Sequence, residues 1–594
     1  MRDKFAYCLK LITGLGVLIF LLQLTWGIYL NHYNIFVADV CDKLYLKELT
    51  EHYINSKKGY SLFWNARWIL PGLSFLLCVR ISGVIIKDAP LIGKRGDGIF
   101  VSIAHTFRGN ITYFKNLPVI VRVSIAALFI IQFFSLIYFS SVLPYHYDEA
   151  YTYIYFSGKG MLSSLAYYPV PNNHVFYNIV SSILLALPVD EVFAIRLVSI
   201  IAGIIATWYF FKLANKLLPQ TLSLVVTVIY TFSYPIAYYN TQGRGYSLMV
   251  LFALLVMYCF ISLAEGKNIG KYLSLYTIAS ILGFFTIPSF LYCFVFINML
   301  LLLHFILRFQ WENIGWFLVS NVFIVGLTAL LYTPLIMRNT WKALTENNGV
   351  VKRDAQYIKD NIWPHLNDTW GFFTGGSSLS FDWLLLLFGF IVLHFFRKGY
   401  LNKMYCLFLL TMLLSPIPII YYHQTIPFTR TWSYLMIPLC LAIGVMLHML
   451  VLGCQFILRR INLNISNAVS FGLVVTISFV MLSRFYRKYQ ENAVVDYTTA
   501  HYAMLLKGKL PFINNFGQSL GDLSFYLAED LNFESIRNLN GKRLELNVVK
   551  ANDTPAYDMV VLDKRYLLQP LNLENYNMVR YDNPFFIVYL KKGL

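Results

Sequence analysis

The sequence IVRVSIAALFIIQFFSLIYFSSVLPYHYDEAYTY (residues 120–153) joins a long apolar run to two adjacent carboxylates, Asp148 and Glu149. A helix of about twenty apolar residues is long enough to cross the roughly 30 Å hydrocarbon core of a membrane. Residues 120–143 are therefore predicted to span a membrane. The end of that span is predicted to hold two acidic side chains at the membrane surface.

The composition of the whole chain agrees with a membrane location. Of the 594 residues, 58% are hydrophobic and 13% are charged, and the charged share is about half of that in soluble globular proteins. These values exclude an ordinary cytosolic enzyme. The aromatic share of 17% is typical of lipid-facing helices with aromatic belts at both interfaces. The chain is predicted to be a polytopic α-helical membrane protein in contact with membrane lipids.

The net charge of +18 would favour nucleic-acid binding in a soluble protein. Here the basic residues fall largely in short loops between apolar runs, which is the pattern that sets membrane topology. No nucleic-acid partner is expected. The eight cysteines include no CxxC pair, so the sequence predicts neither a metal cluster nor a disulfide framework.

Apolar runs near twenty residues predict about thirteen transmembrane helices. The first run lacks a small-residue cleavage site, so we interpret it as a retained helix rather than a signal peptide. The predicted spans are 11–30, 68–87, 120–143, 193–214, 221–239, 246–264, 272–287, 289–307, 314–333, 381–396, 402–421, 432–457 and 465–483.

Lysine and arginine recur on alternate connections, which indicates a cytoplasmic N-terminus. Over thirteen spans, the C-terminal tail and the connections 144–192, 240–245, 334–380 and 422–431 then lie on the outer side. The abundance of Lys, Asn, Ile and Tyr favours an AT-rich bacterial gene. The membrane is therefore expected to be the bacterial inner membrane, with the periplasm outside.

Three regions are predicted along the chain. Residues 1–119 hold extra transmembrane helices and a cytoplasmic connection, and residues 120–483 form the transmembrane core. Residues 484–594 change in composition: helix-period leucines precede the β-rich runs RLELNVV, MVVLD and FFIVYL, with turn signals between them. This tail is predicted to be a small exoplasmic α/β domain.

Asp148 and Glu149 are the first candidates for chemistry. Carboxylates beside a low-dielectric layer tend to have raised pKa values, which makes them plausible general bases. The alternative is that the two residues merely cap a helix or lie in headgroup water, since helix N-termini prefer acidic residues.

Arginines at the same outer edge are the second group of candidates. Arg244, in YNTQGRGYSLM (239–249), begins a predicted span, where a guanidinium is costly unless it has an anionic partner such as a lipid phosphate. Arg430, in HQTIPFTRTWSYLMIP (423–438), and Arg196 could likewise either bind an anion or serve only as membrane-edge residues. The alternatives are that Arg244 only reaches for headgroups and that Arg430 is an ordinary interfacial anchor.

In their order, these motifs resemble those of the GT-C membrane glycosyltransferases. The resemblance is to family 39, the type that includes protein O-mannosyltransferases and the aminoarabinose transferases acting on lipid A. The matching segments are YDEAYTY, NNHVFYNIV, EVFAIRLVSIIAG, GRGYSLM and PFTRTWSYLMIP, within residues 120–460.

The resemblance implies a GT-C-like fold and transfer of a sugar from a polyprenyl-phosphate donor to a glycan, lipid or protein acceptor, with inversion. It implies that Asp148 accepts the proton of the acceptor hydroxyl and that Glu149 positions or tunes Asp148. For the donor phosphate the candidates are Arg244 and Arg430, with His174 lining the site and Tyr246 and Arg196 as second choices. The chain has no GxxxxGK or GxGxxG nucleotide motif. No obligatory metal is expected, although a carboxylate pair leaves weak divalent-cation binding open.

Two other functions fit the same number of spans. A transporter or lipid-linked saccharide flippase should place charges midway through its spans and show internal repeats. This chain instead concentrates charges in outer loops. An outer-leaflet glycan polymerase or ligase would rely on arginines in a large late loop, and the connection 334–380 is large enough to keep that alternative open.

Overall fold

The computed structural model describes residues 108–594, with gaps at 145, 169–171, 340–350, 377, 396–398, 458–466, 520, 540, 551–555, 567–570 and 581–582. The predicted spans 11–30 and 68–87 lie outside the described residues, as does nearly all of the predicted region 1–119.

The described part of the chain is a multi-pass helical membrane protein. Seven of its helices are long and apolar enough to cross a membrane, or up to nine if each of two bent pairs counts as one span. Each of the seven coincides with a predicted span. They are α7 (Val119–Val142), α11 (Glu191–Leu217), α14 (Tyr246–Ala264), α15 (Ile269–Thr286), α16 (Leu291–Leu307) with the preceding η3 (Pro288–Phe290), α17 (Trp311–Asn339), and α23 (Met436–Ile457) with the preceding η4 (Thr429–Leu435).

Two predicted continuous spans are bent pairs instead. Helices α12 (Gln220–Phe232) and α13 (Tyr234–Asn240) meet at 59°, and α21 (Gly399–Leu414) and α22 (Pro416–His423) meet at 44°. Pro235 is the second residue of α13, and Pro416 is the first residue of α22. Proline lacks the backbone N–H that a continuous helix would need at that point, which explains the two breaks.

The remaining two predicted spans are helical, but neither is among the described helices that are long and apolar enough to cross a membrane. Helix α20 (Phe381–Phe395) matches the predicted bounds 381–396 to within one residue and is shorter than the candidate spans. Helix α24 (Asn467–Asn492) continues beyond the predicted end at residue 483. Helix α14 is buried on every side, as expected for a helix that is apolar all round. The turn 241–245, which precedes α14, is therefore held at one end of the best-buried span.

Short helices fill the connection between α7 and α11. They are α8 (Tyr147–Tyr155), η2 (Ser157–Lys159), α9 (Met161–Ala166) and α10 (Val175–Leu184), and a later connection holds α19 (Ala355–Thr374). Helix α8 begins with a capping box: the ring of His146 accepts the Asp148 N–H, and Glu149 accepts the His146 N–H. This box fixes both carboxylates in the first turn of α8.

The C-terminal region is an α/β domain, as the sequence predicted. It contains α25 (Val494–Leu506), η5 (Leu510–Phe512), β1 (Phe516–Gln518), α26 (Asp522–Asn538), β2 (Asn547–Val548), β3 (Met559–Asp563), η7 (Lys564–Tyr566), β4 (Tyr576–Arg580) and β5 (Phe586–Lys591). The sheet order is β2-β1-β3-β5-β4. Strand β1 is parallel to β2 and β3, and β5 is antiparallel to β3 and β4.

Two of the predicted β-rich runs match strands closely. MVVLD forms β3 and FFIVYL overlaps β5, whereas only Asn547 and Val548 of RLELNVV pair as a strand. The helix-period leucines Leu523, Leu527 and Leu531 lie on α26 and are buried in the core of this domain.

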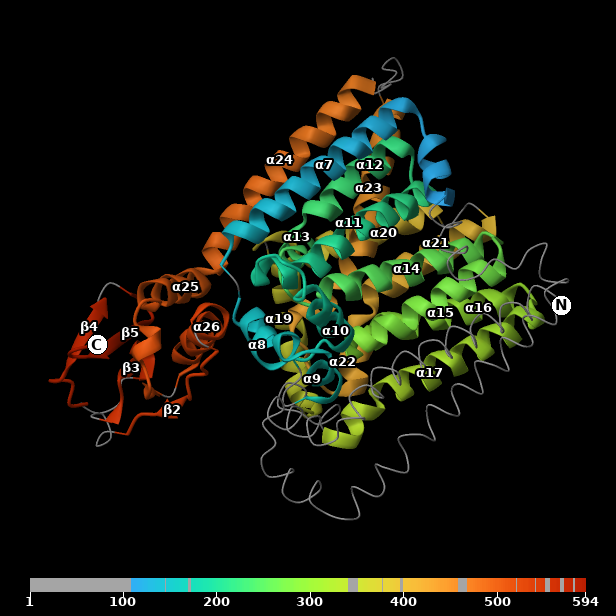
Figure 1. The fold of residues 1–594 in the computed structure, drawn as a ribbon. Helices are drawn as coiled ribbons and strands as arrows, with labels where there is room; N and C mark the ends of the chain where they lie inside the picture. Colours follow the sequence, from blue (N-terminus) through green and yellow to red (C-terminus); the bar gives the residue numbers. More distant parts are fainter. Residues whose placement is uncertain are drawn as a thin grey trace, which may run out of the picture.

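Figure 1 shows how the parts are arranged. The long helix α24 leads out of the transmembrane bundle into α25, and α26 lies beside α8. Helix α8 therefore lies between the transmembrane helices and the C-terminal domain.

Candidate active site

Glu149 is the buried anchor of the site. Its carboxylate pairs with Arg196 at the start of α11, through Nε to Oε1 at 2.9 Å and Nη2 to Oε2 at 2.8 Å, and both side chains are fully buried. Arg196 also donates to the backbone carbonyls of Ser140, Leu143 and Pro144. All five N–H groups of this guanidinium are thus used, so Arg196 joins α11 to the end of α7 and to α8.

The pKa of Glu149 is lowered. Burial alone would raise it, but the charge and hydrogen bonds of Arg196, with the backbone N–H groups of Gly243 and His146, stabilise the ionised form more strongly. Because both of its oxygens accept hydrogen bonds from these groups, Glu149 acts as a fixed structural charge. The expectation from the sequence that the pKa of Glu149 is raised is therefore wrong.

Asp148 is the more accessible carboxylate of the pair, with 13% of its side chain exposed. Its Oδ2 lies 3.4 Å from Nη1 of Arg430 and 3.8 Å from Nη2 of Arg244. Burial would raise the pKa of Asp148, but Arg244 and then Arg430 lower it to about 2. The expectation of a raised pKa is wrong here too, because the two cations outweigh desolvation.

Arg244 is held firmly from several sides. Its Nη1 donates to Thr152 Oγ1 at 2.7 Å and to the carbonyl of Asn172 at 3.1 Å, and its Nη2 donates to Asn172 Oδ1. Its Nε has no hydrogen-bond partner among the described residues, and the same holds for Nε of Arg430. Two buried guanidinium N–H groups are therefore available to an additional acceptor near Asp148.

The glycines on either side of Arg244 allow a close backbone approach. The Gly243 N–H donates to Glu149, and the Gly245 N–H donates to Nδ1 of His174 at 2.9 Å. A Cβ on Gly243 would lie 3.2 Å from Oε1 of Glu149, and one on Gly245 would lie 2.8 Å from Cβ of His174. The tripeptide 243–245 thus contacts Glu149, Asp148 and His174 in turn.

His174 is buried beside the arginines. Because Nδ1 accepts the Gly245 N–H, the neutral ring carries its proton on Nε2. Burial, together with the charges of Arg244 and Arg430, lowers the pKa of His174 well below its usual value and keeps the ring neutral. Its Nε2 lies 3.4 Å from Nη2 of Arg244, so this edge of the ring faces the cationic side of the site.

Tyr246 completes the group around His174. The two rings meet edge to face with centroids 4.9 Å apart, and Tyr246 packs against Tyr239 at 4.4 Å. Five of the seven predicted residues, Asp148, Arg244, Arg430, His174 and Tyr246, therefore lie together. The other two, Glu149 and Arg196, form the buried pair next to them.

Sequence reasoning missed two groups that hold Arg244. Thr152 lies four residues after Asp148, which puts both on one face of α8, and Asn172 belongs to the NNH segment already singled out. Helical spacing could have found Thr152. No pattern of residues predicted the contact between Asn172 and Arg244. Among the described residues, no group of three or more His, Cys, Asp or Glu side chains is arranged to hold a metal ion.

Comparison by sequence finds neither a family model nor a curated protein that matches this chain. Its fold does match solved structures. Crystal structures of ArnT from Cupriavidus metallidurans, in the apo state and bound to undecaprenyl phosphate, each superpose with a TM-score of 0.51 at 12% identity. Each alignment covers 79% of this chain and 97% of ArnT.

A second structure is more distant. The arabinosyltransferase EmbB from Mycobacterium smegmatis gives a TM-score of 0.38 at 10% identity, over 71% of this chain and 45% of EmbB. The ArnT match is the one that carries weight. The chain has the fold of ArnT, which confirms the structural resemblance to GT-C membrane glycosyltransferases that the motifs predicted.

Proposed function

We propose that this protein is an inverting membrane glycosyltransferase that moves a sugar from a polyprenyl-phosphate donor to an acceptor hydroxyl on the outer face of the membrane. The observation that carries the proposal is the convergence of Arg244 and Arg430 on Asp148. A carboxylate beside two cations can receive a proton while the cations bind a phosphate leaving group.

In this reaction Asp148 accepts the proton of the acceptor hydroxyl as its oxygen attacks the anomeric carbon. The bond from that carbon to the phosphate oxygen breaks, and the phosphate leaves as an anion. Arg244 and Arg430 balance its charge. Their Nε groups, which have no hydrogen-bond partner among the described residues, would supply two of the hydrogen bonds. The crystal structure of ArnT with undecaprenyl phosphate supports this class of donor.

Donor binding would also activate the base. Without a donor, the two arginines lower the pKa of Asp148 to about 2 against the effect of burial, which leaves it a weak base. A phosphate that shares the same arginines adds a negative charge beside Asp148, and a nearby like charge raises the pKa of a carboxylate. Proton acceptance would then be favoured only when a donor is present.

The remaining predicted residues have supporting roles in this proposal. Glu149 positions Asp148, and Arg196 serves Glu149 rather than the donor, because its donors are all engaged. His174 and Tyr246 line the phosphate side.

We propose no obligatory metal, because the arginines supply the positive charge. The membrane would be the bacterial inner membrane, with the site and the C-terminal domain on the periplasmic side.

The substitution Asp148→Asn tests the proposed base. Asparagine has nearly the same shape and loses the charge, so transfer should be abolished while expression and folding persist. Mass spectrometry of glycolipids and glycoproteins from cells with no gene, wild type or the variant would detect the loss and would name the sugar and acceptor. Asp360→Asn, at an exposed carboxylate of α19, is the matched control. Full transfer by Asp148→Asn would overturn the role of Asp148.

The substitution Arg430→Ala tests the phosphate clamp. Arg430 is 31% exposed and its ion pair is with Asp148, so its removal should disturb folding less than removal of Arg244. A lost charge-assisted hydrogen bond costs about 1.5–3 kcal/mol, which predicts at least about tenfold weaker binding of undecaprenyl phosphate. The exposed Arg353 provides an Arg→Ala control. Unchanged affinity would leave Arg430 as an interfacial anchor only.

A further inference from the structure

Helix α8 is in contact with both the candidate active site and the C-terminal domain. Its first turn carries Asp148 and Glu149, while its tyrosines pack on α26. The Tyr147 ring lies 4.7 Å from that of Tyr526, and the Tyr153 ring lies 4.8 Å from that of Phe533. Phe533 is fully buried in the same apolar cluster as the α8 side chains. A movement of α26 would therefore be transmitted to the helix that carries the proposed base.

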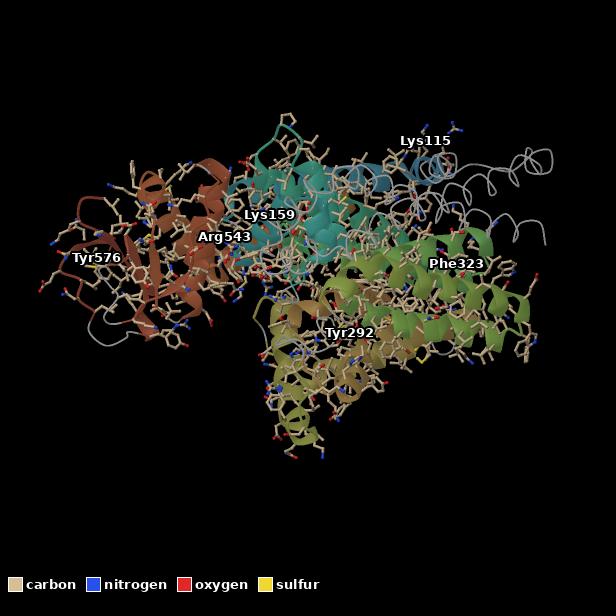
Figure 2. The ribbon with its side chains drawn as sticks, turned by 60° about the horizontal axis from the view of Figure 1, so that its bottom comes forward. Lys115, Lys159, Tyr292, Phe323, Arg543 and Tyr576 are labelled. Carbon is tan, nitrogen blue, oxygen red and sulfur yellow. The ribbon has the colours of Figure 1, made fainter. Side chains whose placement is uncertain are left out.

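A buried polar contact lies at the far end of the same helix. The Tyr155 hydroxyl donates to Oε1 of Glu529 at 3.3 Å and accepts a hydrogen bond from Nη2 of Arg543. The Arg543 guanidinium carbon also lies 4.6 Å from the centre of the Tyr155 ring. Figure 2 shows Arg543 at the junction between the C-terminal domain and the outer segment that follows α7. One tyrosine hydroxyl thus joins two groups of the C-terminal domain to α8.

Glu529 is costly to bury, which argues for a role. The side chain is fully buried, and Oε2 has no hydrogen-bond partner among the described residues. Burial raises the pKa of Glu529 to about 7, although Arg543 and the Tyr155 hydrogen bond lower it. An apolar residue would pack in this position at less cost. The carboxylate contributes an acceptor for Tyr155 that an apolar residue cannot provide.

Helix α8 depends on such contacts for its position. It has nine residues, whereas isolated helices shorter than about 12–15 residues are marginal in water. At 1.5 Å per residue it is about 13 Å long, so a tilt of about 5° pivoting at one end moves the other end by about 1 Å. A misplacement of that size can cost about a hundredfold in rate.

We propose that the C-terminal domain positions α8 for catalysis and that Tyr155 and Glu529 are the positioning residues of this contact. The catalytic part of this inference rests on the proposed transferase function. Neither residue touches the reacting atoms. They act through α8 by fixing where Asp148 lies relative to Arg244 and Arg430.

A second contact between the C-terminal domain and the rest of the protein is more exposed and involves α11. Arg537 of α26 pairs with Asp190, the N-cap of α11, and with Glu191, the first residue of α11. Exposed ion pairs contribute little, so the buried contact at Tyr155 should dominate the positioning of α8.

The test uses the full-length protein with Tyr155→Phe, Glu529→Ala and Glu529→Gln. Phenylalanine keeps the ring on Tyr151, 4.2 Å away, and loses the hydroxyl. Glutamine at position 529 keeps an acceptor for the Tyr155 hydroxyl, so Glu529→Gln should retain the hydrogen bond that Glu529→Ala loses. Tyr566→Phe is the matched control, because Tyr566 is exposed on the same domain. Hydrogen–deuterium exchange of residues 147–155, binding of undecaprenyl phosphate and the glycan product in cells are measured for each variant.

For Tyr155→Phe and Glu529→Ala we expect faster exchange in α8 and about ten- to a hundredfold less product. The loss of affinity for undecaprenyl phosphate should be smaller than the loss of product, and it is not zero because Thr152 of α8 also holds Arg244. Glu529→Gln and Tyr566→Phe should resemble wild type. If Tyr155→Phe does not fold, the comparison of Glu529→Ala with Glu529→Gln still tests the proposal, because the two variants change the same position and differ in whether it offers an acceptor to Tyr155.

Wild-type exchange in α8 for both disruptive variants would overturn the proposal, as would faster exchange with a wild-type level of product. Equal damage from Glu529→Gln and Glu529→Ala would also overturn it, because the acceptor would then not be what matters. If the wild-type chain makes no product, the proposed function fails. Faster α8 exchange in the two variants would still support the contact as the one that orders α8.

Discussion

Replacing Arg196 with methionine should destabilise the protein strongly while leaving its affinity for undecaprenyl phosphate intact. Methionine keeps much of the length of the side chain and removes all five donors. The substitution would leave the fully buried Glu149 without its countercharge and the carbonyls of Ser140, Leu143 and Pro144 without their donor. The end of α7, the start of α11 and the first turn of α8 would lose their common link.

The magnitude follows from the burial of the pair. Removing one partner of a buried ion pair typically costs about 3–5 kcal/mol, because the other charge stays buried without compensation. Glu149→Gln should cost less, about 1–3 kcal/mol, since Arg196 would keep its three carbonyl partners and glutamine still offers an acceptor. The double variant should be more stable than the sum of the two losses predicts, because it contains no uncompensated charge.

Equilibrium unfolding by SDS in mixed micelles, followed by tryptophan fluorescence, would measure these differences. Arg430→Met is the matched control, because Arg430 is 31% exposed. If Arg196→Met were no more destabilising than Arg430→Met, the structural role of Arg196 would be refuted. Weaker binding of undecaprenyl phosphate by a folded Arg196→Met variant would instead restore Arg196 as a phosphate ligand.

Two further predictions concern the arginine turn and the docked domain. Gly245→Ala should lower the free energy of unfolding by about 1–3 kcal/mol and displace His174, because the new Cβ would lie 2.8 Å from Cβ of His174. Gly389→Ala on α20 is the control, because its new Cβ would meet no described atom within 4 Å. Equal stability of the two variants would contradict the prediction. The other prediction concerns the pH dependence of stability. Burial raises the pKa of Glu529 from 4.5 to about 7 in the folded protein, so its proton stabilises the folded state. This stabilisation, about 3 kcal/mol in the free energy of unfolding, is fully present below about pH 4.5 and is lost as the pH rises through about 7. Thermal unfolding from pH 5 to 8 should show a larger loss of stability in wild type than in Glu529→Gln, because the raised pKa values of Asp496 and Asp530 act in both proteins. The difference between the two proteins isolates Glu529 from His174, whose lowered pKa acts in the opposite direction.

Hydropathy predicted the spans well, because membrane helices must be long and apolar whatever they pack against. Helix α14 has the predicted bounds, and α7 differs by one residue at each end. The errors arose where a local feature overrode the average. Pro235 and Pro416 each break a run that a window of twenty residues reads as continuous, and α24 extends past residue 483 because it leads towards the C-terminal domain.

The sequence predicted which charges lie together at one edge of the membrane, but not how they pair. Topology alone brings Asp148, Arg244 and Arg430 to one side, and in the structure they meet. The sign of the carboxylate pKa shifts could not be predicted, since it depends on whether a guanidinium lies within a few ångströms. The contact between Tyr155 and Glu529 joins residues 374 positions apart, and a single sequence holds no signal for such a pairing.

The adjacency of the two carboxylates explains why their roles differ. Successive residues of an α-helix point about 100° apart, so Asp148 and Glu149 cannot face the same partners. Glu149 points into the bundle, where Arg196 and the Gly243 N–H fix it, and Asp148 points to the edge, where Arg244 and Arg430 meet it. The buried member holds α8 against the bundle. The partly exposed member remains near two arginines whose Nε groups have no partner in the part of the chain that the structure describes. An aspartate–glutamate pair at the first turn of a short helix therefore supplies both the anchor and the candidate base.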